Sequence, residues 1–260
     1  MIRRATALLC VSLFAVFCGP VFAQSTDDEK YIGAGARLRP AYDGADSTRV
    51  DAIPYVRLYG EHFFARTVHG LLEGGWRTQP LGGVIFGAQA AYEEGRRSRD
   101  SAFLSERHFD DLDPSVSLGV HAESSWKIGP VPMGVLLRYR HDVEADNGAQ
   151  ADVRAAVGIL DWRGWRAGLF GQWTWNDTKA TQRYFGITPQ QSATSGLPAY
   201  SPGSGTRYVQ AGLLGDIDIA RHWVGLWTVN WQQLQADAAD SPLTQQRDNW
   251  FANAGVAYRF

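Results

Sequence analysis

The stretch SVSLGVHAESSW at Ser115–Trp126 decides the fold. One face of this stretch is apolar and carries Val116, Leu118, Val120, Ala122 and Trp126. The other face is small or polar and carries Ser117, Gly119, His121, Glu123 and Ser125. A period of two is typical of a β-strand with one apolar face. Strands of roughly 9–11 residues cross a bilayer when they are tilted, so this stretch is long enough to span a membrane.

The same alternation occurs in four other stretches, at 32–39, 131–141, 151–159 and 250–260. In each of them Ala, Val, Leu and aromatic residues share one face, whereas Gly shares the other face mainly with charged or amide residues. A soluble β-sandwich also alternates, but it places its larger residues inside. Small and polar residues on one face indicate the lumen of a barrel, and the sequence therefore predicts an all-β, antiparallel, up-and-down transmembrane barrel.

Tryptophan supports the same interpretation because it gathers near the predicted strand ends. Outer-membrane barrels carry girdles of aromatic residues at both membrane interfaces. The candidate girdle residues are Trp126, Trp162, Trp165, Trp173, Trp175, Trp223, Trp227 and Trp231.

The first 23 residues have the features of a secretory signal peptide. Arg3 and Arg4 precede an apolar run from Ala5 to Phe17, and Val21-Phe22-Ala23 provides small residues at a cleavage site. A membrane anchor is the alternative, but the apolar run is short for one. We expect cleavage after Ala23, which leaves residues 24–260 as a single-domain barrel in the outer membrane of a Gram-negative bacterium.

Composition excludes several classes of function. The two cysteines, Cys10 and Cys18, both lie in the predicted signal peptide, which argues against disulfide scaffolds, cysteine-ligated metals and thiol catalysis. Lys and Arg number 25 against 27 Asp and Glu, so the chain lacks the basic excess of a nucleic-acid-binding protein.

Connection lengths give the strand count. Short connections are predicted at 60–61, 79–81, 128–130, 161–164 and 220–222, and long ones at 41–49, 94–114, 144–150, 176–205 and 235–248. Outer-membrane barrels have short periplasmic turns and long outside loops. With a tight outside turn near Val68–Gly70, the chain forms 12 strands and both termini are periplasmic. If His62–Trp76 is one irregular strand, the count is ten.

Three loop motifs resemble one protein family. The longest motif contains Tyr184, Phe185, Gly186, Thr188, Pro189, Ser195, Gly196, Leu197, Pro198 and Tyr200. A second contains Asp237, Asp240, Ser241 and Pro242, and a short third is Arg39-Pro40-Ala41-Tyr42-Asp43-Gly44. Together they resemble the MipA/OmpV family, the MltA-interacting proteins of the Gram-negative outer membrane.

The resemblance implies a non-enzymatic barrel without cofactor or catalytic residues. It also implies a scaffold that brings a lytic transglycosylase together with a penicillin-binding murein synthase. Other members of the family are porin-like proteins, adhesins or proteins linked to antibiotic uptake. A small channel or an uptake or adhesion barrel therefore remains the alternative function.

The Tyr184–Tyr200 segment needs apolar cover. Pro189, Gly196 and Pro198 exclude a continuous strand or helix there, while its aromatic and aliphatic side chains suit no wholly solvated loop. Two arrangements remain open: a plug inside the barrel, or an ordered outside cap with its own small core. The Asp237–Leu243 segment is expected to lie beside it.

Charged residues on the polar strand faces are candidates for the lumen. An arginine on the lipid face at mid-bilayer costs roughly 2–4 kcal/mol, so these side chains point inward. Expected acidic partners are Asp152, Glu123, Asp216 and Asp218. The predicted lumen-facing residues are Arg37, Arg39, Arg138, Arg140, Arg154, Arg166 and Glu123. They form either an ion-paired network that closes the lumen, which we favour, or an anion-favouring pore.

Histidine and acidic clusters offer little for catalysis. The six histidines form no HExxH or HxH motif, so no metal site is predicted. His108–Asp113 is the densest polar run, and a solvated acidic loop explains it better than a cation site. His121 and Glu123 share a strand face and could form a catalytic pair, although two polar neighbours in a wet lumen explain them better.

The last residues form a candidate signal for the barrel-assembly machinery, in which Tyr258 and Phe260 continue the lipid-facing row. We predict that Phe260→Asp lowers the yield of folded, heat-modifiable barrel more than Arg259→Asp does, because Arg259 lies on the opposite face. Equal yields of folded barrel from the two variants in electrophoresis would contradict this prediction.

Overall fold

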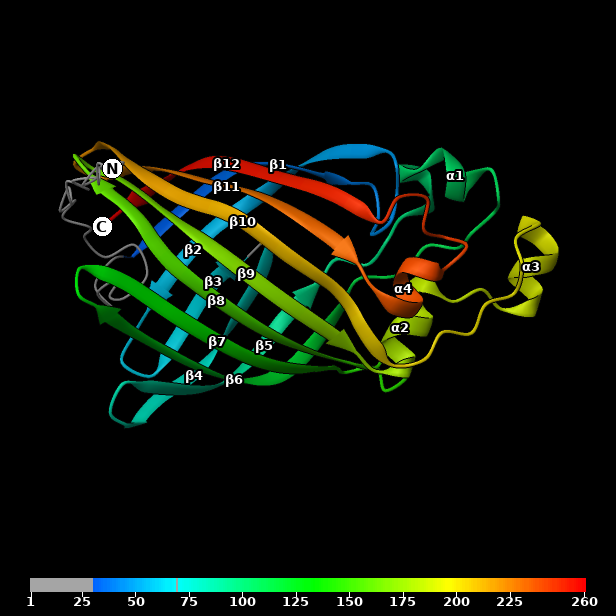
Figure 1. The fold of residues 1–260 in the computed structure, drawn as a ribbon, viewed down its shortest axis with the longest axis horizontal. Coiled ribbons are helices and arrows are strands. Elements are labelled where there is room, and N and C mark those ends of the chain that lie inside the picture. Colours follow the sequence, from blue (N-terminus) through cyan, green and yellow to red (C-terminus); the bar gives the residue numbers. More distant parts are fainter. Residues whose placement is uncertain (1–29, 69) are drawn as a thin grey trace, which may run out of the picture.

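The structure is a computed structural model and describes residues 30–68 and 70–260, so the predicted signal peptide and Gln24 lie outside the described residues. The described chain is a closed antiparallel barrel capped by short helices at one end (Figure 1). Its strands are β1 (Tyr31–Pro40), β2 (Thr48–Tyr59), β3 (Phe63–Val68), β4 (Leu71–Leu81), β5 (Val84–Glu93), β6 (Ser115–Ile128), β7 (Val131–Asp142), β8 (Ala149–Trp162), β9 (Trp165–Asn176), β10 (Gly205–Ala220), β11 (Trp223–Leu234) and β12 (Asp248–Arg259). Its helices are the 3₁₀ helix η1 (Ser98–Asp100) and α1 (Ala102–Ser105), α2 (Thr178–Phe185), α3 (Pro189–Ser195) and α4 (Ala236–Asp240).

Pairing between the first and last strands closes the barrel. The β1–β12 register runs from Tyr31 opposite Arg259 to Leu38 opposite Ala252. Each other strand pairs with its neighbours in the sequence, which gives 12 strands in the ring. Pairing around the ring satisfies backbone hydrogen bonds in lipid, where no water can replace them, although β2 pairs with β3 only at Arg57–Tyr59. The up-and-down topology predicted from the alternation is therefore confirmed.

The ten-strand alternative is wrong because residues 63–76 form a hairpin. β3 and β4 pair from Val68 opposite Leu71 to Phe63 opposite Trp76. Gly70 supports the tight turn with a φ of +81°, which glycine adopts without a steric penalty. The β4–β5 turn also lies slightly later than predicted. It falls at Gly82-Gly83 rather than at 79–81, and Gly83 again has a positive φ, of +85°.

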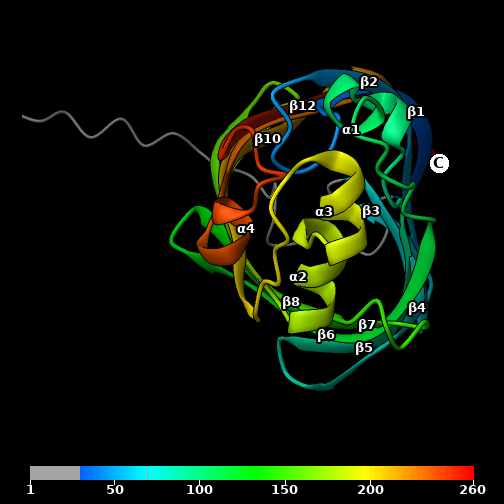
Figure 2. The same ribbon diagram turned by 90° about the vertical axis from the view of Figure 1, so that its right-hand side faces the viewer.

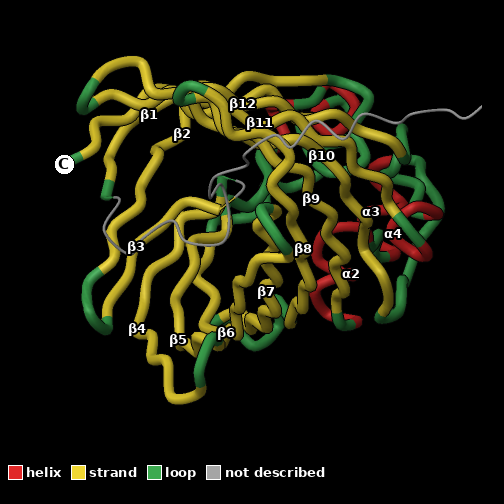
Figure 3. The backbone as a smooth tube through the Cα atoms, turned by 60° about the vertical axis from the view of Figure 1, so that its left-hand side comes forward, coloured by secondary structure: helices red, strands yellow, loops and turns green. Residues whose placement is uncertain are grey.

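The two ends of the barrel differ as the connection lengths predict. Short turns lie at one end, where the chain also ends at β12 (Figures 1 and 3). The long connections lie at the other end, where α2 and α3 cover the mouth of the barrel when it is viewed along its axis (Figure 2). The end with the short turns is the periplasmic end.

The predicted faces of the strands match the exposure of their side chains. On β6, Leu118 and Val120 on the outer face are 56% and 58% exposed, whereas Ser117 and His121 inside are 3% and 4% exposed. Large apolar side chains therefore face the bilayer, as in other barrels of this class. No helix within the described residues is both long enough and apolar enough to span a membrane.

One tyrosine packs across the seam that closes the barrel. A Cβ atom on Gly35 of β1 would lie 2.6 Å from Tyr55 Cε2, and one on Gly255 of β12 would lie 2.4 Å from the same atom. The Tyr55 hydroxyl donates a hydrogen bond to Asn253 Oδ1 at 2.6 Å. The ring can occupy this position only because both neighbouring strands carry glycine there.

We therefore predict that Gly255→Val destabilises the barrel by about 1–3 kcal/mol, because it overpacks the seam against Tyr55 and the β1 backbone. Thermal unfolding followed by heat-modifiable mobility measures this loss. Gly82→Val is the matched control, since a Cβ at Gly82 meets nothing within 4 Å. Equal melting temperatures of the two variants would contradict the prediction.

Candidate functional site

A buried carboxylate lies at the centre of the lumen. Glu73 of β4 is 2% exposed. Its carboxylate accepts hydrogen bonds from Arg66 Nε and Arg138 Nη1, each at 2.7 Å, and from Gln89 Nε2 at 3.0 Å. Charge-assisted hydrogen bonds of this length are among the stronger polar contacts in proteins. Glu73 is therefore fully paired, although it has left water.

The same arginines carry the network across the lumen. Arg138 of β7 binds Asp152 of β8 with two parallel hydrogen bonds of 2.8 Å. Arg66 of β3 donates to Glu123 of β6 at 2.7 Å. Two of these contacts, Arg66–Glu123 and Glu73–Arg138, join strands three positions apart in the ring, so they pass through the lumen instead of following its wall. We call Arg66, Glu73, Glu123, Arg138 and Asp152 the charged partition.

The outer half of the lumen contains further ion pairs. Arg37 and Arg39 contact Asp51 of β2, at 3.3 Å and 2.6 Å, and Arg37 also contacts Glu94 at 2.7 Å. Arg140 of β7 contacts Glu93 of β5 at 2.9 Å. These arginines were expected in the lumen from their strand faces, whereas their acidic partners were not identified from the sequence.

Arg166 lies towards the periplasmic end. Its Nε donates to Asp216 at 2.7 Å, and its Nη2 lies 3.3 Å from Asp218. Both aspartates had been expected as partners of lumen arginines. The sequence missed Arg66 and Glu73, although both occupy alternating positions on the inner face of a strand, which was the signal available.

Arg154 differs from the other predicted lumen residues, because it forms no ion pair with any residue in the described ranges. Its guanidinium instead lies 4.3 Å from the centre of the Phe170 ring. The expectation that acidic residues neutralise every lumen arginine is therefore wrong for Arg154. Asp152, one of the expected partners, is already bound by Nε and Nη2 of Arg138.

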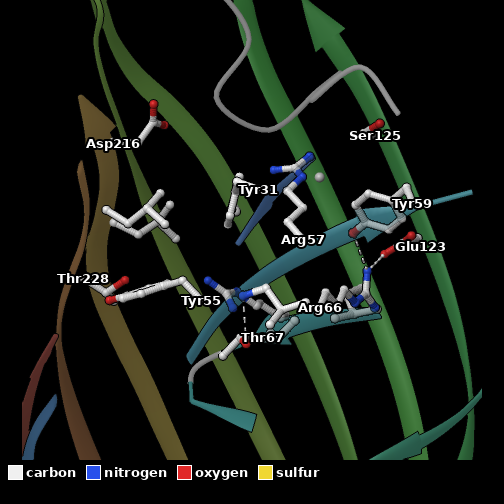
Figure 4. Close-up of a pocket in the computed structure, with 18 of the residues that line it drawn as sticks. Tyr31, Tyr55, Arg57, Tyr59, Arg66, Thr67, Glu123, Ser125, Asp216 and Thr228 are labelled. Carbon is white, nitrogen blue, oxygen red and sulfur yellow. Dashed lines mark hydrogen bonds and ion pairs between the residues drawn. The ribbon is translucent and has the colours of Figure 1, made fainter. Parts of the chain in front are cut away.

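Two cavities lie in the lumen, one on each side of the charged partition, and Val68, Gly70 and Asn253 line both of them. The outer cavity has a volume of about 210 Å³ and includes Arg37, Glu93 and Tyr208 in its lining. The periplasmic cavity has a volume of about 800 Å³, and residues of the periplasmic strand halves line it (Figure 4). Tyr31, Tyr55, Arg57 and Tyr59 are among its lining residues. The lumen thus holds a larger chamber on the side of the short turns.

The outside loops form a cap with its own apolar core. Leu104, Ile187 and Leu243 come from three different loops and are at most 1% exposed. They pack with Ala41, Tyr42, Ala45 and Phe109, and Phe103, Leu197 and Tyr200 lie at the edge of this cluster. The sequence left open a plug or an ordered cap, and this cluster is the core of an ordered cap. Phe185 packs with Leu234 in a second cluster at the barrel mouth.

The family-motif residues bring the loops of the cap together. The Ser241 hydroxyl donates to the Phe185 carbonyl at 2.7 Å. The Tyr200 hydroxyl donates to the Asp237 carbonyl at 2.9 Å, and the Asp237 carboxylate accepts from Gly203 N at 2.6 Å. The two motifs are thus joined directly, and the structural role of Asp237 and Ser241 is to hold the cap closed.

Local sequence explains the shape of the long loop. Thr188 and Gln191 form a capping box at the start of α3, and Pro189 occupies the first helical turn, where its missing N–H needs no partner. Gly196 ends α3 in the left-handed conformation, with a φ of +73°. Proline and glycine therefore mark the ends of a short helix within the segment.

Tyr42 ties the short third motif to the cap. Its hydroxyl donates to the Leu243 carbonyl at 2.9 Å and lies 3.0 Å from Gln245 Oε1. Burial raises the pKa of Tyr42 well above its usual value, which keeps the hydroxyl protonated as a donor. Arg96 stacks over the same ring at 5.8 Å.

The candidate catalytic pair is not assembled. The imidazole of His121 is buried against Phe64, with ring centres 5.2 Å apart, and neither ring nitrogen has a hydrogen-bond partner in the described structure. Glu123 is bound to Arg66 instead. Across residues 30–68 and 70–260, no group of three His, Cys, Asp or Glu residues is placed to hold a metal ion.

Glu73 gives a direct test of the charged partition. We predict that Glu73→Ala destabilises the folded barrel by about 3–5 kcal/mol, because Arg66 and Arg138 would both lose a buried partner. Urea titration of the barrel in detergent measures the change. Glu61→Ala is the control, since the Glu61 side chain is 90% exposed, and its unfolding midpoint should not move. A Glu73→Ala midpoint equal to that of the control would show that the partition does not stabilise the fold.

Sequence comparison identifies relatives of the whole barrel. Residues 32–260 match the family model of the MltA-interacting protein MipA. The MltA-interacting protein of Escherichia coli (strain K12) is 26% identical over 87 residues, which are 33% of this chain and 34% of that protein. The match thus spans about a third of that relative. YiaT of Escherichia coli (strain K12), described as an outer-membrane protein, is 22% identical over 96% of this chain and 98% of its own length.

Among solved structures, the NanC porin covers 88% of this chain and 100% of its own, with a TM-score of 0.49 and 7% identity. The COG4313 outer-membrane channel of Pseudomonas putida F1 covers 93% and 99%, with a TM-score of 0.47 and 11% identity. Family and fold are those of an outer-membrane barrel protein and not of an enzyme family. The protein is thus located in the outer membrane, and the chain belongs to the MipA family of MltA-interacting proteins.

Proposed function

We propose that the protein is a non-conducting scaffold that is anchored in the outer membrane and binds murein enzymes at its periplasmic face. The observation that carries this proposal is that the lumen is obstructed at two levels. The charged partition joins β3, β4, β6, β7 and β8 inside the barrel, and the cap covers the outer mouth. Such a barrel serves better as an anchor than as a passive pore.

The energetics of the partition support this role. Arg138 and Glu73 are buried, and their contact joins β7 to β4 across the lumen. Opening a water path along the lumen would separate such pairs, and each separated pair would lose its charge-assisted hydrogen bonds. A state with an open partition would therefore be rare without a ligand or partner to stabilise it.

The periplasmic face offers a surface for a protein partner. Lys127, Arg163 and Arg221 lie at the short turns and are exposed. Arg163 stacks over the exposed ring of Trp162 at 4.9 Å, and arginine and tryptophan are among the side chains enriched at protein interfaces. The name of the relative from Escherichia coli, MltA-interacting protein, suggests that the partner is a murein enzyme. A lytic transglycosylase and a penicillin-binding murein synthase are the partners that we propose.

Site-specific photocrosslinking in cells tests this role. We predict that a crosslinker at Lys127 or Arg221 captures a lytic transglycosylase, whereas one at Gln190 in the cap does not, because α3 lies at the opposite end of the barrel (Figure 1). Equal capture from Gln190, or no capture of a murein enzyme from the turns, would contradict the scaffold role.

Planar-bilayer recording on the purified protein completes the same test. The intact barrel should give no stable conductance steps, because the partition and the cap both block the lumen. Large, stable steps in the intact protein would instead support the alternative of a small porin-like channel.

A further inference from the structure

We propose that the periplasmic cavity is a binding site for a small organic anion, in which Arg57 and Arg154 bind the charged group and tyrosines contact the uncharged part. The proposal goes beyond the scaffold role and does not depend on it. The cavity volume of about 800 Å³ falls in the range of roughly 300–1,000 Å³ that is usual for small-molecule sites.

Most charged groups around this cavity already have partners. Arg66 is bound to Glu73 and Glu123, and Asp216 is bound to Arg166. The two acidic residues that line the cavity, Glu123 and Asp216, are therefore both neutralised by arginine. These pairs leave Arg57 and Arg154 without an acidic partner among the described residues.

Arg57 and Arg154 enter the cavity from opposite walls. Arg57 lies on β2 and Arg154 on β8, and these strands are six positions apart in the ring of 12. Figure 4 shows the Arg57 side chain extending into the chamber between Tyr31 and Tyr59. Two cations that approach one chamber from opposite sides are the arrangement expected around a bound anion.

Both guanidinium groups are held by aromatic rings rather than by carboxylates. Arg57 lies 5.9 Å from the centre of the Tyr31 ring and 5.5 Å from that of Tyr59, and its buried Nε has no hydrogen-bond partner. Arg154 lies over Phe170. Arg57 also forms a side-chain hydrogen bond with Tyr31, and a guanidinium has five N–H donors, so donors remain on Arg57 and on Arg154 to bind an oxyanion.

The unpaired charges also give a thermodynamic reason for a ligand. A buried cation without a counter-charge is costly, and an anion that binds between the two arginines removes that cost. A carboxylate is planar and a phosphate is tetrahedral, but each presents two oxygens that arginine can bind in a bidentate manner. The charged group of the ligand is therefore an oxyanion of this kind.

The tyrosines define the rest of the ligand. Tyr31, Tyr55 and Tyr59 come from β1 and β2 and line the cavity, with Tyr31 and Tyr59 on either side of Arg57 (Figure 4). The Tyr55 hydroxyl is already bound to Asn253, so this residue offers chiefly the face of its ring. Aromatic faces next to arginine select a flat or apolar group that carries an acid, and an aryl carboxylate or aryl phosphate is the simplest such molecule.

Ligand-observed NMR on the full mature protein in lipid nanodiscs tests the proposal. The probes are benzoate and phenyl phosphate, with benzyl alcohol as the neutral analogue and inorganic phosphate as the anion without a ring. At least one aryl anion should bind saturably and more tightly than both benzyl alcohol and inorganic phosphate. Which of the two aryl anions binds more tightly identifies the preferred oxyanion.

Matched variants locate the site. Arg57→Gln and Arg154→Gln should each weaken binding of that anion about tenfold or more, which is the usual loss of one charge-assisted contact. Arg39→Gln removes the same charge from the outer cavity, on the far side of the charged partition, and should leave the affinity unchanged. Heat-modifiable mobility should show that all three variants are folded, since none removes a residue of the partition.

Three results would overturn the proposal. The first is that neither aryl anion binds more tightly than benzyl alcohol. The second is that Arg39→Gln weakens binding as much as Arg57→Gln, which would indicate a general effect of net charge. The third is that folded Arg57→Gln and Arg154→Gln bind with unchanged affinity. None of these measurements involves a murein enzyme, so failure here is distinct from failure of the scaffold role.

Discussion

The constraint on which this structure depends is that an unpaired strand edge is costly in lipid. Pairing of β1 with β12 closes the ring, and the edge between β2 and β3 is the one that is paired over only a short stretch, at Arg57–Tyr59. Closure then fixes the rest, because every second side chain on each strand must face the lumen. A ring of 12 strands has a lumen too large for one layer of small side chains to fill, and arginines with their acidic partners occupy it.

Inside the lumen the buried charged side chains pair with one another, because a buried charge without a partner is costly. Glu73 meets this need by accepting from Arg66 and Arg138 at the same time. Because two contacts of the charged partition join strands that are not neighbours, they both satisfy buried charge and narrow the interior between the two cavities. The cap adds a second closure, built from loops that are far apart in the sequence and that share one small apolar core.

The two chambers differ in their electrostatics. In the outer chamber, arginines such as Arg37 and Arg140 are matched by acids. In the periplasmic chamber, Arg57 and Arg154 contact aromatic rings and have no acidic partner in the described residues. A barrel that is closed to the outside and positively charged towards the periplasm is suited to interactions within the periplasm, both with protein partners at its turns and with a small anion in its chamber.

The sequence by itself determined the up-and-down barrel and the lipid-facing side of its clearly alternating strands, whereas the structure decided between 12 strands and ten. Alternation with a period of two is a local property of the sequence. Because charge is costly in lipid, the strand face that carries Arg138 or Arg154 must point inward. Only the tertiary structure decided which acidic residue pairs with each lumen arginine. Glu73 meets Arg138 because of the shear of the ring and the reach of their side chains, and neither can be read from spacing along the chain. For the same reason the sequence could not show that Asp152 would be occupied by Arg138 and leave Arg154 without an acid. The apolar core of the cap likewise forms only when loops that are far apart in the sequence meet in the folded barrel, so it could not be predicted from any one loop.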